Sequence, residues 1–420
     1  WKSITKGLPE GTLLWRIVQD HVNPNLLFLG TEYGVYISLN KGKSWDKFST
    51  GLPTISVRDL AIQKRENDLV LATFGRSFYV LDDYSALRDL DNELMEKDGH
   101  IFKPRKALQY NQIYGGTSSD GGQTYYAKNP AYGANIKFYI KDAPKSLKQK
   151  RNKTEKENTD FIGWEALDNE MSEQKNQSIL IIKNKNGEVV SKISNSLKKG
   201  INNVNWSLSS SIPTTVKSGS KSRYSSGVYT QAKEGKYDLF LYTRINGVVS
   251  KVAGPVELEV EKIRKGTLQN PLGDQHSDYY KKLAETFTKV ELLKHKIEKA
   301  SDRVDTYQSV LMGLKNDINE SSKLVFDLVE TKNKLERKIG GSESKKEVGE
   351  KDNLTIYDRL WSARGGWYSN SYGPTALHMR SYDIAKKMLD RLEPEISDYL
   401  SKVDKVGKIL EEAGAPIVLD

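Results

Sequence analysis

The sequence predicts a multidomain protein of β and α regions, with repeated β-sheets first, an antiparallel β-sandwich next and an α-helical bundle or coiled coil last. Three observations support this fold class: a repeat with a period in the low forties, short strands joined by Asn-Gly turns, and an apolar stripe at helical spacing. We expect the three regions to span residues 1–90, 101–265 and 272–420 of the 420-residue chain.

A repeat opens the chain and defines the first region. Residues 1–9 (WKSITKGLP) recur 44 residues later as 45–53 (WDKFSTGLP). Two further pairs follow at an offset of 42: Arg16 with Arg58, and Thr31 with Thr73. A period of this length, filled with short strands, is typical of one four-stranded β-propeller blade. We therefore expect the last blades of a propeller, beginning in the middle of a blade, in a fragment of a longer protein whose upstream part was removed.

A hairpin motif lies between the two copies of the repeat. Residues 38–45 (SLNKGKSW) have the form Ser-x-Asp-x-Gly-x-x-Trp, with Asn40 in the Asp position. An Asn side chain can bond backbone amides, Gly42 can adopt a positive φ, and Trp45 can pack under the turn. We expect Ser38, Asn40, Gly42 and Trp45 to have a structural role.

The middle of the chain reads as an antiparallel sandwich that follows a polar connector at 84–100. Residues 136–140 (IKFYI) place alternate apolar side chains on one face, which indicates a half-buried strand. Asn-Gly pairs at 186–187 and 246–247 are typical of hairpin turns between strands. The highly charged, Asn-rich residues 143–176 are expected to be an insertion in this domain.

Beyond residue 271 the apolar period becomes helical. One stripe recurs at intervals of three and four: Leu283, Phe287, Val290, Leu293, Ile297, Ala300, Val304, Tyr307, Leu311, Leu314 and Ile318. An unbroken helix from Gln275 to Ile318 would be about 65 Å long at 1.5 Å per residue. Further helices are expected at 324–339, near 354–360, and from Pro374 or Thr375 to about Ala413. These segments predict an antiparallel bundle that could dock partners or brace the sandwich.

Several strings resemble large sortilin-like, BNR-repeat (Asp-box) bacterial proteins that are labelled glycosyl hydrolases. They are GTEYGVYIS, GLP and ATFGRSFYVLDD in the first region, NPAYGANIKFYIKD, ILIIKNKNGEVV, GINNVNWSL and GKYDLFLY in the middle, and YGPT and AGAP near the end. The resemblance covers nearly the whole chain. It implies a fibronectin-III-like sandwich after the propeller, Asp boxes remote from the ligand face, and an extracellular, cell-surface or periplasmic location.

Two groups of side chains are candidates for ligand binding. A sialidase needs arginines for the substrate carboxylate, and Arg76 in the segment FGRS is the best candidate; its alternative role is an ion pair with Asp82 or Asp83. An expected aromatic turn could stack on a sugar or peptide, or simply pack against the bundle: Trp361, Trp367, Tyr368 and Tyr372.

The composition excludes several kinds of site. The chain has no cysteine, which rules out disulfides, a thiolate nucleophile and a zinc–thiolate site. Its five histidines are too far apart for a short metal motif, and no cofactor fingerprint occurs. The net charge is +10, but basic and acidic residues are mixed, so nucleic-acid binding is not expected. No apolar run is long enough to span a membrane.

The expected function is a non-catalytic interaction or scaffold module of an extracellular or cell-envelope protein. Protein partners and a carbohydrate or peptide ligand are expected, with no metal or cofactor. One alternative is a sialidase-type glycoside hydrolase whose catalytic residues lie mostly upstream. A third interpretation is a protease-associated or peptide-binding propeller.

Overall fold

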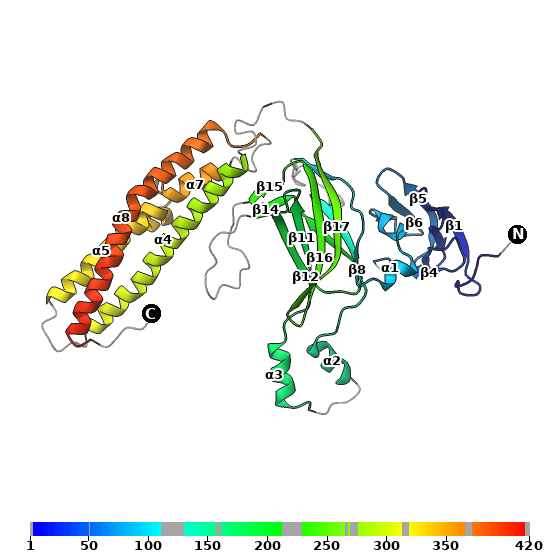
Figure 1. Ribbon diagram of the computed structural model, residues 1–420, viewed down its shortest axis with the longest axis horizontal. Coiled ribbons are helices and arrows are strands. Elements are labelled where there is room, and N and C mark those ends of the chain that lie inside the picture. Colours follow the sequence, from blue (N-terminus) through cyan, green and yellow to red (C-terminus); the bar gives the residue numbers. More distant parts are fainter. Residues whose placement is uncertain are drawn as a thin grey trace. The chain divides into compact units, whose positions relative to one another are not determined.

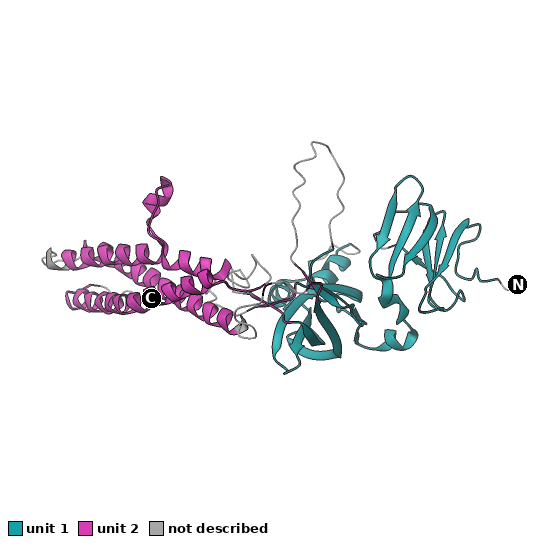
Figure 2. Cartoon of the chain, turned by 90° about the horizontal axis from the view of Figure 1, so that it is seen from above, with its two compact units in different colours: residues 1–108, 125–207, 234–261 teal, residues 109–124, 208–233, 262–420 magenta. Residues whose placement is uncertain are grey.

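The structure is a computed structural model that describes residues 3–49, 51–110, 130–156, 161–211, 229–264, 268, 276–312, 319–365 and 372–415. It shows a mixed β and α protein, with antiparallel sheets in the earlier part of the chain and helices in the last part (Figure 1). The chain divides into two compact units (Figure 2): residues 1–108, 125–207 and 234–261, and residues 109–124, 208–233 and 262–420. Residues 208–233, from the middle of the expected sandwich, therefore belong to the helical unit.

Two antiparallel sheets open the first unit. The first sheet has four strands in chain order: β1 (Leu14–Gln19), β2 (Leu27–Thr31), β3 (Gly34–Ser38) and β4 (Asp46–Phe48). The second sheet has three: β5 (Val57–Gln63), β6 (Asp68–Thr73) and β7 (Phe78–Leu81). Within the part of the chain that the structure describes, these sheets do not form a closed propeller.

The two sheets share one apolar core. The first sheet and its β1–β2 turn contribute Leu26, Phe28, Val35 and Ile37, and the second contributes Val57, Leu60, Leu69 and Leu71. Neighbouring side chains on a strand point to opposite faces, so a second, smaller cluster forms on the other face of the first sheet. That cluster contains Leu27, Leu29, Tyr36 and Trp45, with Leu8 packed against it.

The segment expected to be a polar connector is instead part of the core. It forms the 3₁₀ helix η1 (Tyr84–Arg88) and the short helix α1 (Asn92–Glu96). Tyr84 and Leu87 are buried in the cluster between the two sheets, and Leu94 packs with Phe102. The expectation was wrong because few apolar side chains lie here, but most of them are spaced so that they turn inward, with Met95 exposed.

Two further antiparallel sheets follow in the first unit. A three-stranded sheet has the order β13 (Gly200–Trp206), β10 (Ala134–Ile140), β8 (Gly99–Ile101). A five-stranded sheet has the order β12 (Val189–Ser196), β11 (Gln177–Asn184), β16 (Gly235–Ile245), β17 (Val248–Lys262), β9 (Ala107–Gln109). The sheets meet where the rings of Trp206 and Tyr237 pack edge to face, with centroids 5.2 Å apart.

The charged insertion contains helices that its composition did not reveal. They are α2 (Leu147–Thr154) and α3 (Trp164–Ser172), and neither has a buried side chain. The Arg151 Nε lies 2.7 Å from a carboxylate oxygen of Glu170, which joins the two helices. Ion pairing in place of an apolar stripe explains why the helical period was not visible in the sequence.

The second unit consists of a short hairpin and a helical bundle. The hairpin is β14 (Ser209–Ser211) with β15 (Tyr229–Gln231); the helices are α4 (His276–Leu311), α5 (Asn319–Gly340), α6 (Glu343–Glu347), α7 (Ile356–Gly365) and α8 (Ala376–Glu412). One continuous apolar cluster joins α4, α5, α7 and α8. Thr375 and His378 form a capping box at the start of α8, which fixes where that helix begins.

Candidate functional site

A pair of β-bulges lies at the starts of β1 and β5, the first strands of the first two sheets and edge strands of both. The register of β1 against β2 shifts between Leu14 and Arg16, and that of β5 against β6 shifts between Val57 and Asp59. Trp15 and Arg58 are therefore the extra residues of two equivalent bulges. A bulge bends its strand and turns the extra side chain out of the regular alternation.

The turns that follow β2 and β6 bring further side chains to the same end. The Glu32 amide donates to the Leu13 carbonyl at 3.1 Å, and the Phe74 amide donates to the Ser56 carbonyl at 2.9 Å. These two equivalent hydrogen bonds connect each turn to the residue immediately before its bulged strand. As a result the turn at 73–77 holds Phe74 beside Arg58.

Arg58 contacts two aromatic rings. Its Cζ lies 3.8 Å from the Trp15 ring centroid and 5.0 Å from the Phe74 ring centroid. Both distances lie within the usual range for cation–π contacts. The neighbouring carboxylate, Asp59, lies 3.4 Å from Arg16 instead. Among the described residues, none forms an ion pair or hydrogen bond with the Arg58 guanidinium. We call Trp15, Arg58 and Phe74 the stacked-arginine patch.

The patch corrects the alignment of the repeat at these positions. The sequence matched Arg16 with Arg58 at an offset of 42, but the bulges make Trp15 the counterpart of Arg58 and Arg16 the counterpart of Asp59. Both copies carry the bulge, so the bulge itself does not change the offset. The offset is 43 between β1 and β5 but 42 between β2 and β6, because the β5–β6 connection is one residue shorter, and the match of Arg16 with Arg58 was therefore one position off. The sequence signals of the patch were Trp15 near the start of β1 and Phe74 directly after β6.

Arg76, the sequence-based candidate, is exposed in the turn that carries Phe74. The expected ion pair with Asp82 or Asp83 is not formed. Asp83 instead lies 3.3 Å from Lys137 and 3.7 Å from Arg105. Arg76 therefore stays available at the solvent-facing rim of the turn.

A second arginine cluster in this unit is closed to solvent. The Asp20 carboxylate, with no exposed side-chain surface, accepts from Arg88 Nε at 2.8 Å and from the Tyr84 hydroxyl at 2.5 Å. The backbone amides of Val22 and Asn23 also donate to it. Burial and the neighbouring Asp20 raise the pKa of Tyr84, which keeps its phenol protonated. A tyrosine in this state does not act as a nucleophile.

The Asp-box residues form a self-contained hydrogen-bonded turn. Ser38 Oγ accepts from the Gly42 amide at 2.8 Å, and Asn40 Oδ1 accepts from the Ser44 amide at 2.9 Å. Gly42 has a φ of 79°, and Trp45, which is 4% exposed, donates from Nε1 to the Ile4 carbonyl at 2.6 Å. Every one of these contacts stays within the sheet and its preceding segment.

The four aromatic candidates do not form one open turn in the described residues. Trp361 lies inside α7 rather than in a turn, because the helix continues to Gly365. Its ring packs edge to face with Phe287 at 5.7 Å, and Arg364 lies 4.7 Å above it. Tyr372 is partly buried. Trp367 and Tyr368 lie outside the described residues.

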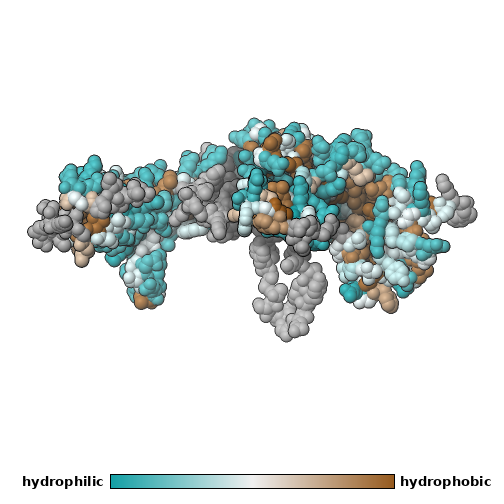
Figure 3. Space-filling model, turned by 90° about the horizontal axis from the view of Figure 1, so that it is seen from below, coloured by the Kyte–Doolittle hydropathy of each residue, from teal (hydrophilic) through white to brown (hydrophobic). Residues whose placement is uncertain are grey.

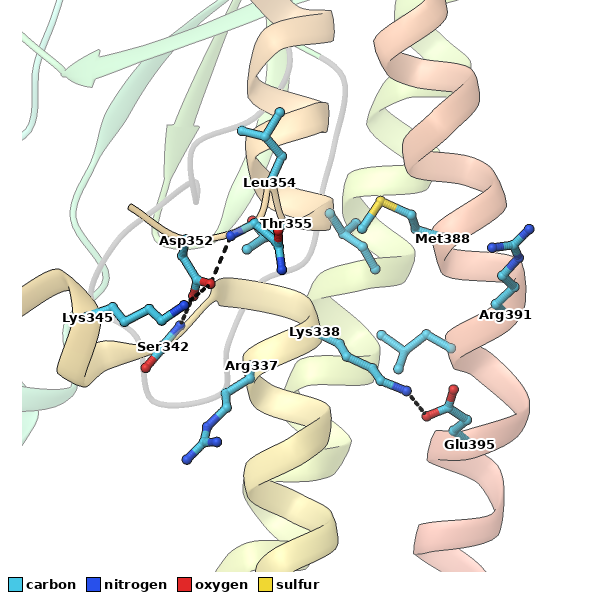
Figure 4. Close-up of a pocket in the computed structure, with 13 residues that line it drawn as sticks. Arg337, Lys338, Ser342, Lys345, Asp352, Leu354, Thr355, Met388, Arg391 and Glu395 are labelled. Carbon is cyan, nitrogen blue, oxygen red and sulfur yellow. Dashed lines mark hydrogen bonds and ion pairs between the residues drawn. The ribbon is translucent and has the colours of Figure 1, made fainter. Parts of the chain in front are cut away.

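A groove of about 500 Å³ lies in the helical unit between the end of α5, the segment at 342–356 and α8 (Figure 4). Its two acidic side chains are already paired with lysines. Lys338 Nζ lies 2.5 Å from Glu395, and Lys345 Nζ lies 3.1 Å from Asp352. The Ser342 amide and Lys345 lower the pKa of Asp352 to about 2. Both carboxylates that line the groove, Asp352 and Glu395, are therefore already in ion pairs with lysines.

Neither a family model nor a curated protein matches the chain. Two solved structures resemble it, both of the extracellular domain of BT4673 from B. thetaiotaomicron, which is described in one case as a one-component system and in the other as a hybrid two-component system. Identities are 12% and 14% over 61% and 63% of this chain, with TM-scores of 0.16 and 0.17. The chain spans about a quarter of those chains, 26% and 27%. Similarity at this level carries no argument about function.

Two general features bear on partners. In the described part of the chain, no three His, Asp or Glu side chains gather as metal ligands would. Of the helices described, none combines the length and the apolar character needed to cross a membrane.

Proposed function

We propose that this chain is a non-catalytic ligand- and protein-binding module of an extracellular or cell-envelope protein. The observation that carries the proposal is the stacked-arginine patch. Arg58 contacts two rings, and none of its N–H donors is used by the described residues. Aromatic faces and unused charged donors suit binding, whereas acid–base chemistry on a glycoside needs two suitably placed carboxyl groups.

The first two sheets are, in this proposal, neighbouring β-propeller blades. By strand register, Leu14 and Ile17 of the first sheet are the counterparts of Val57 and Leu60, which are buried between the sheets. Leu14 and Ile17 are nevertheless 42% and 46% exposed. Their face also holds an apolar groove of about 260 Å³. A further sheet of the same repeat fits this face.

The outer face of the second sheet supports the same proposal. Phe78 and Val80 are the counterparts of Val35 and Ile37, which lie in the core between the sheets. Both are well exposed, and apolar side chains are visible at the surface near the N-terminal end (Figure 3, brown). The following two sheets, joined by Trp206 and Tyr237, support the proposal of a fibronectin-III-like sandwich.

The cellular location in this proposal comes from the sequence resemblance to sortilin-like, BNR-repeat proteins. Protease treatment of intact cells that produce the native protein tests it. Cleavage of the protein on intact cells, with a cytoplasmic marker left whole, is the expected result. Protection until the envelope is broken would contradict an outer-surface location.

The test of binding is a screen of the purified chain on peptide and glycan arrays. Trp15→Ala should remove the bound signal, because it takes away the closer of the two rings on Arg58. Trp164→Ala is the matched control, since Trp164 is 74% exposed on a helix of the insertion. Binding that is absent, or that survives Trp15→Ala unchanged, would contradict the proposed site.

The same protein should not hydrolyse glycosides. Within the described residues, two clusters combine a tyrosine, a carboxylate and an arginine: the buried one at Asp20, and Arg303 with Asp404 and the buried Tyr307 in the helical bundle. Fluorogenic sialosides and hexosides should give no turnover above a heat-denatured sample. Turnover that disappears in Arg76→Ala would favour the glycoside hydrolase alternative.

A further inference from the structure

The groove between α5 and α8 carries positive charge that its own side chains do not neutralise. Six charged side chains line it, four cationic and two acidic: Arg337, Lys338, Lys345, Arg391, Asp352 and Glu395. Both carboxylates are paired with lysines. Within the described part of the bundle, neither Arg337 nor Arg391 pairs with an acidic side chain. The excess charge therefore belongs to two exposed arginines, one on α5 and one on α8.

The walls of the groove are held together by contacts that need no ligand. The Asp352 carboxylate accepts hydrogen bonds from the Ser342 amide at 2.9 Å, the Asn353 amide at 2.8 Å and Lys345 Nζ at 3.1 Å. Across the groove, the Lys338 side chain of α5 reaches Glu395 of α8 (Figure 4). A site that is formed in advance loses less conformational entropy when it binds a ligand.

Apolar side chains form the rest of the groove. Ile356 and Leu392 are buried in the core of the bundle, and Met388 packs against that core and is partly buried. Leu354 is 56% exposed. A ligand that covers Leu354 removes apolar surface from water, and the flexible side chain of Met388 can adjust to its shape. A ligand that fits this lining carries an apolar group as well as negative charge.

We propose that this groove binds an acidic peptide segment of a partner protein. Carboxylates of the segment contact Arg337 and Arg391, and an apolar side chain between them lies against Leu354 and Met388. An arginine fork matches the two oxygens of a carboxylate, and a volume of about 500 Å³ is large enough for a short segment. A polyanionic sugar chain supplies charge but no apolar side chain for Leu354. The site goes beyond the proposed function, because it does not use the stacked-arginine patch.

Three matched peptides test the two parts of this chemistry on the full chain. The probe is fluorescein-labelled acetyl-Glu-Leu-Glu-Leu-Glu-amide, and its binding is followed by fluorescence anisotropy. One matched peptide has Gln in place of every Glu, and the other has Ser in place of every Leu. We expect the probe to bind saturably and each matched peptide to bind about tenfold or more weakly. Heparin, added as a competitor, should displace the probe less effectively than the unlabelled peptide does.

The methyl group of Met388 reports whether the peptide occupies the groove. The chain has five methionines, so ¹³C-methyl labelling gives few signals, and Met388→Leu identifies the signal of Met388. This signal should shift as the probe saturates. The signal of Met171, on helix α3 of the other compact unit, should not move.

Variants test the arginines and the apolar contact separately. Arg337→Gln combined with Arg391→Gln should weaken probe binding about tenfold or more. Arg380→Gln combined with Lys405→Gln is the control, because it removes the same charge from exposed positions of α8 outside the groove lining. Leu354→Ser should weaken the probe but not the Ser-containing peptide. Thermal melts by circular dichroism establish that the variants are folded.

Several results would overturn the proposal. They are no saturable binding of the probe, equal binding of the Gln-containing peptide, an unshifted Met388 signal at saturation, or unchanged affinity in the arginine double variant. Displacement by heparin as effective as that by the peptide would replace the peptide with a polyanionic sugar. Binding that is lost in Trp15→Ala but kept in the arginine double variant would move the peptide to the stacked-arginine patch and leave the proposed function standing.

Discussion

Two arginine clusters in the same compact unit contain similar residues, but one is buried around a carboxylate and the other is exposed. Arg88 lies 5.3 Å from the Tyr84 ring centroid, and Arg58 lies 3.8 Å from that of Trp15. The first cluster encloses the Asp20 carboxylate and is buried with it, while the second has no acidic partner among the described residues. The comparison teaches that an arginine stacked on an aromatic ring stabilises the fold when a carboxylate is buried beside it. The same arrangement without a carboxylate is the one that we propose binds a ligand.

The largest expected effect comes from removing the buried carboxylate. Asp20→Ala leaves Arg88, whose side chain is 14% exposed, without its charged partner. Breaking a buried ion pair in this way costs about 3–5 kcal/mol. Urea denaturation followed by circular dichroism measures the change. Asp59→Ala is the control, because its pair with Arg16 is exposed and should contribute less than about 1 kcal/mol. Equal losses in the two variants would remove the distinction between the clusters.

The same carboxylate gives the unfolding free energy a pH dependence. Burial alone would raise the pKa of Asp20, but hydrogen bonds from Arg88, Tyr84 and Asn23 together hold it well below its usual range. A lowered carboxyl pKa stabilises the folded state above about pH 4, the unfolded value, and this contribution is lost as the pH falls below it. Wild type should therefore lose more stability than Asp20→Ala between neutral pH and about pH 3. Parallel acid curves would contradict this cause.

The next largest effect concerns the Asp-box tryptophan. Trp45→Ala should cost on the order of 3 kcal/mol, because it empties a space among Leu27, Leu29 and Tyr36. It also removes the hydrogen bond to the Ile4 carbonyl. Binding at the stacked-arginine patch should persist in the folded fraction, since the rings that contact Arg58 are those of Trp15 and Phe74. An unchanged melting temperature would contradict the structural role.

Much of the fold could be predicted from the sequence, because a periodic pattern over many residues identifies a helix or strand even where single residues depart from it. The apolar stripe as far as Leu311, the end of α5 at Gly340 and the capping residue Thr375 lie where spacing and helix signals indicate. The helix expected to run to Ile318 ends at Leu311, and Leu314 and Ile318 lie outside the described residues. The site was harder to predict, because it depends on two single-residue bulges. Each bulge inserts one residue and shifts the alternation of the strand beyond it, so that Val57 and Leu60 share a face although they are three residues apart. A repeat aligned by sequence does not reveal this insertion. The position of Trp361 was missed because aromatic residues are as acceptable in the last turns of a helix as in a loop.

A smaller loss of stability is expected when the Tyr84 hydroxyl, which donates to Asp20, is removed. Tyr84→Phe keeps the ring in the core and removes one donor at 2.5 Å from a buried carboxylate. A hydrogen bond to a charged group contributes about 1.5–3 kcal/mol, so the loss should lie below that of Asp20→Ala. Thermal melts of the single variants and the double variant measure how strongly the two residues are coupled. Strictly additive losses would show that the hydroxyl acts independently of Asp20.

The smallest effect on stability should come from the open cluster. In Arg58→Ala the two rings lose a cation–π contact worth about 0.5–1 kcal/mol at an exposed site. Trp15 and Phe74 are themselves 37% and 68% exposed, so little buried apolar surface depends on Arg58. No carboxylate among the described residues is left unpaired by the change. The free energy of unfolding should therefore fall by no more than about 1 kcal/mol.

Arg58→Ala thereby sharpens the comparison between the clusters. The variant should lose the array signal that Trp15→Ala also loses, while its urea transition stays close to that of wild type. Arg88→Ala is the counterpart, because the same truncation there leaves Asp20 buried without its cation. If Arg58→Ala lowers the free energy of unfolding by several kcal/mol and leaves ligand binding intact, the Arg58 cluster has a structural role like the cluster at Asp20. Stability retained with binding abolished would identify Arg58 as the recognition residue of this unit.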